Sequence, residues 1–318
     1  MLLNSIICQD DPRLEVVVSD NGSSDGTAEM VHGFSFLQPL KWHQWEENVG
    51  FDRNLMKVVA IASGEYCWLV GSDDALTPGA VAHILDLIDT YRPSGILPSA
   101  TICDADLTPV QETAPIKPAS FEKISSNEII SRIGVYLGFF SLQIVQRHLW
   151  IQAASDEGWQ KTANNWSQYY MMLKITANLA VDGWLRDPTR VILYRSSSFT
   201  DQIDAVGSVH TKIAKDLTAS MEAITATVPP NILDAFMNNL MQFEVRRDMF
   251  FWNNSNPSWR NRIDMLSLGS QILGKYYWWW LKMVPIIIMP RGGVIAIRFA
   301  VKKAKGVIRN FNTRSNRI

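Results

Sequence analysis

The sequence has few cysteines and no pattern of cysteine and histidine that indicates a metal centre. Its three cysteines, Cys8, Cys67 and Cys103, have no paired spacing. Neither a disulfide framework nor a zinc site is therefore expected, and a reducing compartment is the default. The histidines also lack the spacing of paired metal ligands. They are His32, His43, His83, His148 and His210.

Several common catalytic motifs are absent as well. No Gly-x-Gly-x-x-Gly follows a predicted strand, and there is neither a Walker-type phosphate loop nor a Gly-x-Ser-x-Gly elbow. The first residues do not combine a basic region, an apolar stretch and a small-residue cleavage site, so no secretory signal is expected. Dinucleotide, P-loop and serine-hydrolase chemistry therefore find little support.

Acidic residues are missing from the end of the chain. Asp264 is the last of them, and ten Lys and Arg residues follow it. Residues 1–264 contain 20 basic and 31 acidic residues, a net charge of −11, against +10 for the remainder. The near-neutral total therefore conceals an acidic body and a basic tail.

The basic tail also contains aromatic and apolar runs, at 276–281 and 285–290. Aromatic residues beside apolar residues and lysines favour a segment that lies in the headgroup region of an anionic membrane. A spanning helix fits less well, because the run is shorter than about 20 residues and contains Lys282 and Pro285. Nucleic acid is the competing partner, but the acidic body argues against it. The aromatics could also form the core of a C-terminal helical hairpin.

The most informative stretch of the chain is 64–79. Residues 66–70 are aromatic and branched, lie between glycines and predict a buried strand. Asp73 and Asp74 follow it, at the carboxyl end where open α/β sheets place ligands. Thr77 is then a candidate N-cap and Pro78 a candidate first helical residue, so a helix is expected one turn after the carboxylates.

Adjacent carboxylates at a strand exit repel each other unless a cation or a network of donors compensates them. Oxygen ligands of this kind suit Mg²⁺ or Mn²⁺, which keep several waters and share a substrate's phosphates. The alternative interpretation is a polar turn that only caps a helix.

An upstream stretch, 14–27, has the same design. An apolar strand leads to Asp20, and a turn rich in Gly and Ser then leads to a helix that begins near Thr27. The two strand exits are expected to be neighbours, with their carboxylates converging on one pocket.

Hydrophobic periodicity and turn residues predict further elements along the chain. They are a helix over 1–8 that Asp11-Pro12 ends, a half-exposed strand over 40–46, a helix over 51–62, a strand over 95–103, a helix over 127–137, a short strand over 142–145, a helix start at 164–173 and a strand over 190–194. From 211 onward the pattern is helical.

Three segments together resemble a known family. Residues 18–27 read Val-Ser-Asp-Asn-Gly-Ser-Ser-Asp-Gly-Thr, residues 48–54 read Asn-Val-Gly-Phe-Asp-Arg-Asn, and residues 62–74 end in Ser-Asp-Asp. In this order they resemble family 2 of the inverting nucleotide-sugar glycosyltransferases, which have the GT-A fold. The branch that adds deoxyhexoses such as abequose to bacterial O-antigen is the most similar.

The resemblance implies a fold and a domain organisation. The fold is α/β, a Rossmann-like mixed sheet of GT-A type with a helical C-terminal appendage. The expected domains are 1–205, the transferase domain, and 206–318, the helical region with the basic tail. The family's first strand has no counterpart before residue 14, which would make the chain N-terminally truncated.

The resemblance also implies roles for individual residues. Asp20 and Asn21 would contact the base or ribose of the donor, Asp73 would support the ribose and the metal site, and Asp74 would coordinate Mg²⁺ or Mn²⁺. Arg53 could reach the diphosphate as a charged donor, or it could be a surface arginine paired with an acid.

The catalytic base is not evident. Inversion needs a group that takes the proton of the acceptor hydroxyl, and the family supplies an acid at a helix start. The helix start at 164–173 has no carboxylate, so Asp156 and Glu157 are the candidates, with a solvated surface pair as the alternative. Arg195 could bind phosphate or acceptor, or form a structural ion pair.

The resemblance implies transfer of a sugar, a deoxyhexose in the branch named above, from a nucleotide-diphosphate donor to a lipid-linked oligosaccharide at the cytoplasmic face of the inner membrane. One alternative is a catalytically silent homologue that acts as a membrane-bound scaffold. Another is a nucleotidyltransferase, which shares acidic metal sites but usually begins with a Gly-rich loop that this sequence lacks.

Overall fold

The computed structural model describes residues 1–36, 40–110, 120–133, 137–155, 158–162, 167–179, 183–195, 230–231, 234, 258–274, 277, 279–290 and 293. The chain divides into two compact units. Unit 1 comprises 1–206 with 216–237, and unit 2 comprises 207–215 with 238–318. The domain boundary expected near 205 stays a prediction, because residues 196–229 lie outside the described part of the chain.

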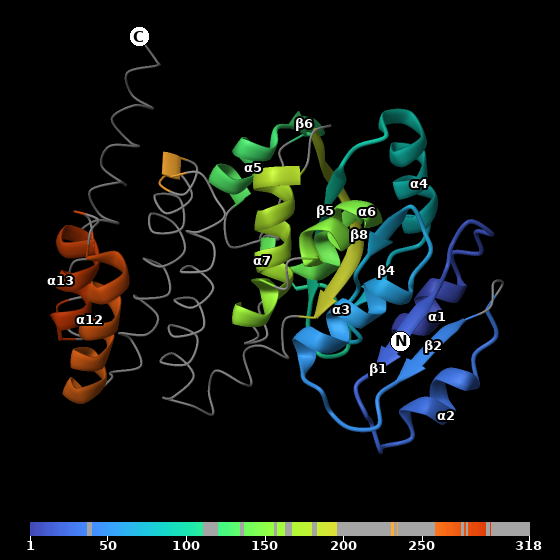
Figure 1. The fold of residues 1–318 in the computed structure, drawn as a ribbon, viewed down its shortest axis with the longest axis horizontal. Helices are drawn as coiled ribbons and strands as arrows, with labels where there is room; N and C mark the ends of the chain where they lie inside the picture. Colours follow the sequence, from blue (N-terminus) through green and yellow to red (C-terminus); the bar gives the residue numbers. More distant parts are fainter. Residues whose placement is uncertain are drawn as a thin grey trace, which may run out of the picture. The chain divides into compact units, whose positions relative to one another are not determined.

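Unit 1 contains two sheets (Figure 1). The smaller sheet pairs β1 (Val17–Asp20) in parallel with β2 (Lys41–Gln44). The larger, six-stranded sheet has the order β3-β7-β5-β8-β4, with β6 also paired to β8. Its strands are β3 (Tyr66–Trp68), β4 (Ala75–Leu76), β5 (Gly95–Cys103), β6 (Glu122–Ile124), β7 (Ile144–Gln146) and β8 (Trp184–Arg195).

The larger sheet is mixed. Only β5 and β8 are parallel to each other, and β3, β4, β6 and β7 pair antiparallel with their neighbours. The strand predicted over 66–70 is shorter and only half-buried, since β3 is an edge strand that pairs with β7 alone. The predicted α/β mixed sheet is confirmed.

The helices of unit 1 lie on both sides of the long strands. Figure 1 shows α4 on one side of β5 and β8, and α5 and α7 on the other. The helical segments are α1 (Leu2–Ile7), α2 (Thr27–His32), α3 (Phe51–Ile61), α4 (Ala80–Tyr91), α5 (Ser126–Ile133), α6 (Arg147–Ala154) and α7 (Ser167–Lys174), with η2 (Phe140–Leu142), η3 (Gly158–Thr162) and η4 (Ile175–Leu179).

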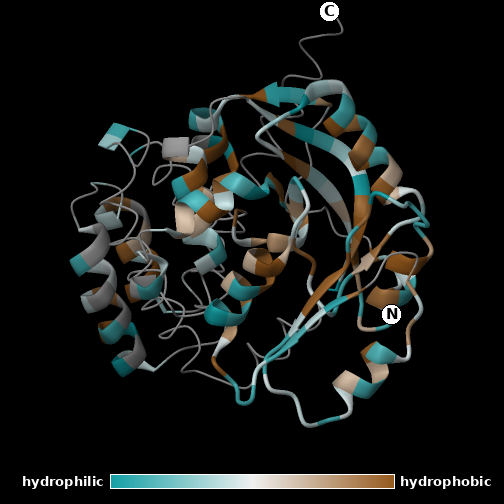
Figure 2. Cartoon of the chain, turned by 45° about the vertical axis from the view of Figure 1, so that its right-hand side comes forward, coloured by the Kyte–Doolittle hydropathy of each residue, from teal (hydrophilic) through white to brown (hydrophobic). Residues whose placement is uncertain are grey.

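The core of unit 1 follows the central strands, where hydrophobic residues are concentrated (Figure 2). Ile96, Leu97 and Ile144 are almost fully buried, as is the large ring of Trp184. That ring packs against the Cα of Gly95, where an added Cβ would lie 2.2 Å from a ring carbon. Glycine at the start of β5 therefore lets β8 approach with an indole between the strands.

The helix expected at Thr77 begins later than predicted. Helix α4 starts at Ala80, and β4 separates it from the carboxylates. Thr77 is not an N-cap, because its backbone N–H donates to the Val191 carbonyl and its hydroxyl to the Arg190 carbonyl, both in β8. The Thr77 hydroxyl therefore donates to a neighbouring strand and accepts no hydrogen bond from the start of α4.

The first helix closes the exposed side of β4. The Ser5 hydroxyl of α1 accepts a hydrogen bond from the Leu76 backbone N–H, at 3.0 Å. The Gln9 amide accepts one from the Val81 N–H in the first turn of α4 and donates another to the Thr77 carbonyl. An edge strand and a helix start both have unpaired backbone groups, and α1 satisfies part of each.

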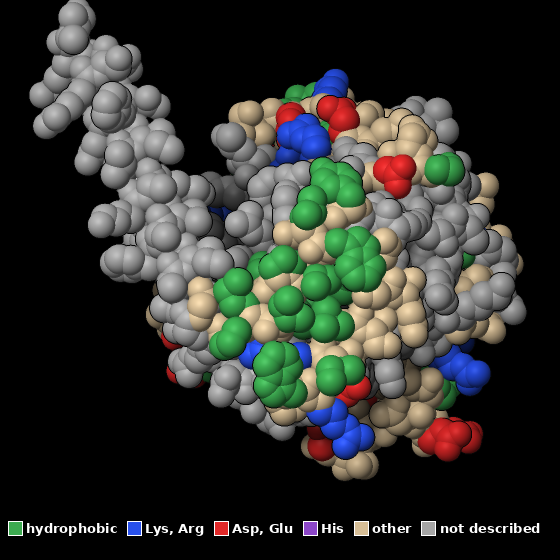
Figure 3. Space-filling model, turned by 90° about the vertical axis from the view of Figure 1, so that its left-hand side faces the viewer, with side chains coloured by type: hydrophobic (Ala, Val, Ile, Leu, Met, Phe, Trp, Pro, Cys, Tyr) green, Lys and Arg blue, Asp and Glu red, His purple; other side chains and the backbone are tan. Residues whose placement is uncertain are grey.

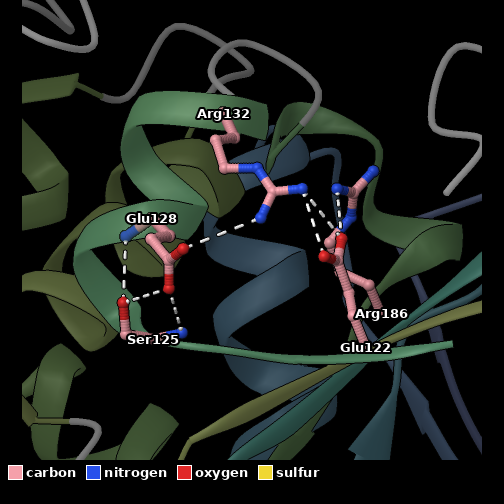
Figure 4. A network of polar contacts seen from close by, with 5 residues as sticks. All are labelled: Glu122, Ser125, Glu128, Arg132 and Arg186. Atoms are coloured by element: carbon pink, nitrogen blue, oxygen red, sulfur yellow. Dashed lines mark hydrogen bonds and ion pairs between the residues drawn. The ribbon is translucent and has the colours of Figure 1, made fainter.

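A polar network holds α5 against β6 and β8 (Figure 4). Ser125 and Glu128 form a capping box at the start of the helix, where Glu128 accepts from the Ser125 N–H and hydroxyl. Arg132 joins Glu128 to Glu122 of β6, and Glu122 also accepts a 2.7 Å hydrogen bond from Arg186 of β8. These contacts fix the start of β8. The other end of this strand is the one that contacts Asp74.

In unit 2 the described helical segments are α12 (Trp259–Leu273), η6 (Trp279–Met283) and α13 (Val284–Ile288). The buried ring of Trp279 packs against the Cα of Gly269, and its indole N–H donates to Ser270. Buried Arg262 donates to the carbonyls of Ile287 and Met289. None of the helices described in the structure is long and apolar enough to cross a membrane.

Candidate active site

The first strand exit is stabilised by its own backbone. Asp20, the last residue of β1, is buried, and its carboxylate accepts a 3.0 Å hydrogen bond from the Ser23 N–H. Its carbonyl accepts the Trp45 N–H, which extends the pairing with β2. Part of the hydrogen-bonding capacity of this carboxylate therefore shapes the turn 20–23, as an Asx-type turn does.

Asn21 connects this turn to the segment before α3. Its side-chain oxygen accepts the Val49 N–H at 2.9 Å, and its amide donates to the side chain of Asn48 at 3.0 Å. The backbone approach is close, since a Cβ on Gly22 would lie 2.6 Å from the Glu47 carbonyl carbon, and Gly22 has φ +74°. Only glycine fits this position without displacing the facing backbone.

Asn54 joins the same exit to the first turns of α3. Its side chain donates to the Ser19 carbonyl at 2.8 Å and accepts from the Ser19 hydroxyl at 2.6 Å. The same oxygen accepts the Trp45 indole N–H at 3.1 Å. One amide therefore holds β1, the residue after β2 and α3 together.

The second strand exit brings two carboxylates together. An added Cβ on Gly71 would lie 2.7 Å from Asp73 Oδ1 and 3.3 Å from Asp74 Oδ2, so both oxygens face the same backbone position. The Gly71 N–H donates to the Ser141 hydroxyl at 2.9 Å, which fixes this turn against η2. The predicted pair is therefore assembled, with Asp74 buried and Asp73 half-buried.

The environment of Asp74 disfavours its charge. Burial, with a further contribution from the charge of Asp73, raises the pKa of Asp74 to about 6. Hydrogen bonds from the Ser141 hydroxyl and from the Arg195 backbone N–H, 3.1 Å away, oppose this rise. The carboxylate therefore lacks the full compensation that a buried charge requires.

Two residues at the end of β8 face the pair. Burial and the charges of Asp74 and Asp73 raise the pKa of the Tyr194 hydroxyl to about 12, so this group stays a neutral donor. The Arg195 backbone binds Asp74, and the positive charge of Arg195 lowers the pKa of that carboxyl. Its buried Nε has no hydrogen-bond partner among the described residues, which leaves a charged donor for an anion.

A divalent metal could bind to the Asp73 and Asp74 carboxylates only if water or a substrate supplied its remaining ligands. In the described part of the chain no group of three or more His, Cys, Asp or Glu could hold a metal ion. Two adjacent carboxylates suit Mg²⁺ or Mn²⁺, because these ions complete their shell with water and phosphate oxygens. The incompletely compensated charge of buried Asp74 is the feature of the structure that favours a cation here.

The two exits are linked through α3, although their strands are not paired. Among the described strands, β1 pairs with β2 and β3 with β7. The two strand exits were expected to be neighbours. This prediction is wrong for the strands themselves, because β1 and β3 lie in different sheets. Phe51, the first residue of α3, contacts Phe140 with ring centroids 6.0 Å apart, and Phe140 lies beside Gly71.

The amino ends of the two strands are also connected. Glu15, just before β1, accepts hydrogen bonds from the N–H groups of Ser63 and Gly64, just before β3. It also accepts from the Ser63 hydroxyl and forms an ion pair with Lys41. These hydrogen bonds and the ion pair lower the pKa of Glu15 to about 2, although its burial acts in the opposite direction.

The remaining predicted residues are less constrained. Arg53 lies in the first turn of α3 and is exposed. Asp156 and Glu157, the candidate bases, lie outside the described residues, as do 163–166 before α7. Buried Asp52 accepts the N–H of Ser167, the first residue of α7, at 3.0 Å.

Three residues of the site, Ser141, Tyr194 and Asn54, were not predicted from the sequence. Ser141 is about 70 positions from Gly71, so local pattern contains no signal for their contact. Tyr194 ends a strand that hydrophobic periodicity had located. Asn54 belongs to the 48–54 segment. The sequence signal that could have identified it is an uncharged polar residue in the amphipathic helix α3.

Structural comparison defines the class of this fold. The N-terminal part of S. aureus TarS, residues 1–349, aligns with a TM-score of 0.62 and 17% identity, covering 86% of this chain and 77% of that one. The same part of TarS in complex with UDP-GlcNAc gives the same values. With UDP it gives a TM-score of 0.61 and 18% identity over 87% and 76%. The fold is that of the GT-A glycosyltransferases, as predicted.

Sequence comparison then gives the family. Residues 2–146 match the family described as Glycosyl transferase family 2. A curated relative, the abequosyltransferase RfbV of Salmonella typhimurium strain LT2, is 40% identical over 95 residues. That alignment spans 28% of this chain and 28% of the relative. The resemblance drawn from the three segments is confirmed.

Proposed function

We propose that the chain is a nucleotide-sugar glycosyltransferase of O-antigen or related surface polysaccharide synthesis. It would transfer a sugar, a deoxyhexose by analogy with the abequosyltransferase, with inversion at the anomeric carbon. Support comes from the family match at 2–146 and from the fold shared with TarS, whose structures include complexes with UDP and UDP-GlcNAc.

The observation that carries this proposal is the pair Asp73 and Asp74, whose carboxylates face one position beside Gly71, with Asp74 buried and its pKa raised. Asp74 would hold Mg²⁺ or Mn²⁺, and Asp73 would support that site and the donor ribose. When bound, the metal would neutralise the departing diphosphate as a Lewis acid. Arg195 would add a fixed positive charge on the same side, because its backbone binds Asp74.

The nucleoside end of the donor would lie at the first strand exit. Asp20 and Asn21 are held there by the Ser23 and Val49 N–H groups. A turn fixed by its own hydrogen bonds needs little reorganisation when a ribose or base binds, so binding would cost less conformational entropy. Exposed Arg53, in the first turn of α3, would contact the diphosphate.

The acceptor would be a lipid-linked oligosaccharide at the cytoplasmic face of the inner membrane. Its hydroxyl needs a base for in-line attack, and Asp156 and Glu157 remain the candidates. Asp52 is less suited to this role, since its carboxylate already accepts the N–H at the start of α7.

The test is transfer of a radiolabelled sugar to membrane extracts, by the unchanged chain and by Asp74→Asn. We expect transfer to require Mg²⁺ or Mn²⁺ and to be lost in the variant. Asp86→Asn is the matched control, because Asp86 is an exposed carboxylate on α4. Equal transfer by Asp74→Asn and the unchanged chain would contradict the proposal that Asp74 holds the metal.

The alternative is a catalytically silent scaffold of the same fold. It is favoured by the absence of a carboxylate from 164–173, where the family places its base. Calorimetric titration with nucleoside diphosphates separates the two functions. A transferase should show heat of binding that depends on Mn²⁺, and a scaffold should show none.

A further inference from the structure

Exposed hydrophobic side chains are concentrated in unit 2. Of the eleven large hydrophobic residues that are exposed in the described chain, six lie on the short stretch that includes α12, η6 and α13. They are Trp259, Ile263, Tyr277, Trp280, Leu281 and Ile288. Isolated exposed hydrophobics are ordinary, whereas a contiguous patch marks an interaction surface.

These side chains form one face of the unit. Figure 3 shows hydrophobic side chains gathered on that face, with both basic and acidic side chains at its edges. Trp259 and Ile263 are one helical turn apart on α12, so they lie on the same stripe. Leu281 is 71% exposed and Trp280 51%, although both adjoin the fully buried Trp279.

The inner contacts of unit 2 hold this face outward. Trp279 is fixed by its packing on Gly269 and its hydrogen bond to Ser270, which determines where its neighbours in η6 point. Arg262 fixes the end of α13 by its hydrogen bonds to Ile287 and Met289. The six exposed hydrophobic side chains are therefore not part of the packed interior of unit 2.

Charge identifies the occupant of this surface. No acidic residue follows Asp264, and the ten Lys and Arg residues after it oppose a body of net charge −11. In a symmetric dimer formed through this face, the second copy would bring the same basic segment to the interface, and the two segments would repel each other. An anionic bilayer attracts basic segments by about 1 kcal/mol per residue near its surface and accepts indole rings at its headgroup level.

We propose that the face formed by these six residues is a membrane-docking surface that lies in the plane of an anionic bilayer. Trp259 and Trp280 would sit at the headgroup level, with Ile263, Leu281 and Ile288 in the outer acyl region. The attachment would be peripheral, by burial of apolar side chains together with attraction of the basic segment. This surface rests on the geometry of unit 2 and not on sugar transfer.

The experiment measures sedimentation of the full chain with vesicles of phosphatidylcholine alone and of an equimolar mixture with phosphatidylglycerol. We expect strong binding only to the mixture, with partial loss at high salt. Ile263→Ser with Leu281→Ser should weaken that binding about tenfold or more, because two exposed aliphatic side chains no longer enter the bilayer. Met30→Ser with Ile151→Ser, at exposed hydrophobics of unit 1, is the matched control and should bind normally.

Insertion is checked separately from adsorption. Brominated lipids should quench tryptophan fluorescence of the unchanged chain, and they should do so less in Trp280→Phe. Circular dichroism and thermal unfolding of the serine variants verify that they are folded. Vesicle binding that the Ile263 and Leu281 substitutions leave unchanged would overturn the proposal.

Light scattering tests the competing occupant. If the unchanged chain is a dimer that Ile263→Ser with Leu281→Ser dissociates, while vesicle binding persists, the face is an interface between copies and the proposal fails. Calorimetry with nucleoside diphosphates on the same variants is independent of the membrane. Its result therefore distinguishes failure of docking from failure of the proposed transferase function.

Discussion

The two strand exits of unit 1 have similar sequences but different electrostatics. At the first, the Asp20 carboxylate accepts a backbone N–H from the turn that follows, and Asn21 does the same for the segment before α3. At the second, Asp73 and Asp74 face one backbone position, and the pKa of Asp74 is raised by burial and by its neighbour. One exit is stabilised internally, and the other contains charge that a ligand can compensate.

The comparison shows two different roles for an acidic residue that follows a strand. A carboxylate that accepts hydrogen bonds from its own turn preorganises the backbone around a ligand. A carboxylate buried beside a second one destabilises the unbound protein and gains most from a cation. The first exit is therefore suited to shape recognition and the second to chemistry, and substitutions should separate these two roles.

Asp74→Asn should have the largest effect. Transfer activity should fall by about a thousandfold or more, because the residue proposed to hold the metal becomes neutral. Thermal stability should stay the same or rise, because the repulsion from Asp73 disappears. Steady-state kinetics and a thermal unfolding curve test both expectations. A destabilised variant with near-normal activity would contradict the comparison.

Gly71→Ala should separate geometry from charge. The added Cβ would displace the Asp73 carboxylate, whose oxygen lies 2.7 Å from its position, while both charges remain. A misplacement of about 1 Å at a reacting centre costs about a hundredfold in rate. Stability should change by less than about 1 kcal/mol, because a flexible side chain can move aside. Kinetics and urea unfolding of the same preparation measure the two effects.

Asn54→Ala should weaken the first exit. It leaves the Trp45 indole N–H and the Ser19 hydroxyl and carbonyl without their partner, which should cost about 2 kcal/mol of unfolding free energy. Urea unfolding measures the loss. Asn4→Ala, at an exposed position of α1, is the control and should be near neutral. An equally small change in both variants would mean that this exit is not held by the Asn54 amide.

Arg195→Ala should raise the KM for the donor about tenfold, because Arg195 is proposed to supply a fixed positive charge on the side where the donor's diphosphate would lie. Arg195→Lys should restore part of the affinity through its charge, without the planar donor geometry. The backbone N–H that binds Asp74 persists in both variants. Steady-state kinetics with varied donor concentration provide the measurement, and equal KM values in all three chains would exclude this role of Arg195.

Glu15→Gln should have the smallest effect, about 1 kcal/mol of unfolding free energy at pH 7. The folded-state pKa of Glu15 is depressed to about 2, so its stabilisation is complete above its ordinary pKa of about 4.5. That stabilisation is lost as the pH falls through about 2. Urea midpoints of the variant and the unchanged chain should therefore converge from pH 4.5 downward. A constant difference over that interval would contradict the assignment.

The sequence predicted the strand exits well because glycines and short apolar runs mark them locally. The strand over 95–103 and the helix over 51–62 agree with β5 and α3 within one residue. Local pattern failed where a distant strand intervened. Thr77 has the properties of an N-cap, but its N–H and hydroxyl pair with β8, more than 100 residues away.

The candidate site was predictable in part for the same reason. Asp73 and Asp74 are adjacent in sequence, so their meeting requires only a turn. Ser141 and Tyr194 reach them through η2 and the end of β8, whose positions depend on the order of strands in the sheet. The pairing of β1 and β3 was misjudged because strands that end alike need not share a sheet.

The first turn of α3 has a consequence for the order of events in a reaction cycle. The segment before it holds Asn21, its first residue Phe51 contacts Phe140 beside Gly71, and Asp52 binds the N–H that starts α7. These contacts share the same two or three peptide units at the start of α3. A ligand that shortens one contact therefore also changes the geometry of the others. Occupancy by the nucleotide should therefore change the affinity for the second substrate, and by reciprocity the second substrate should change the affinity for the nucleotide by the same factor.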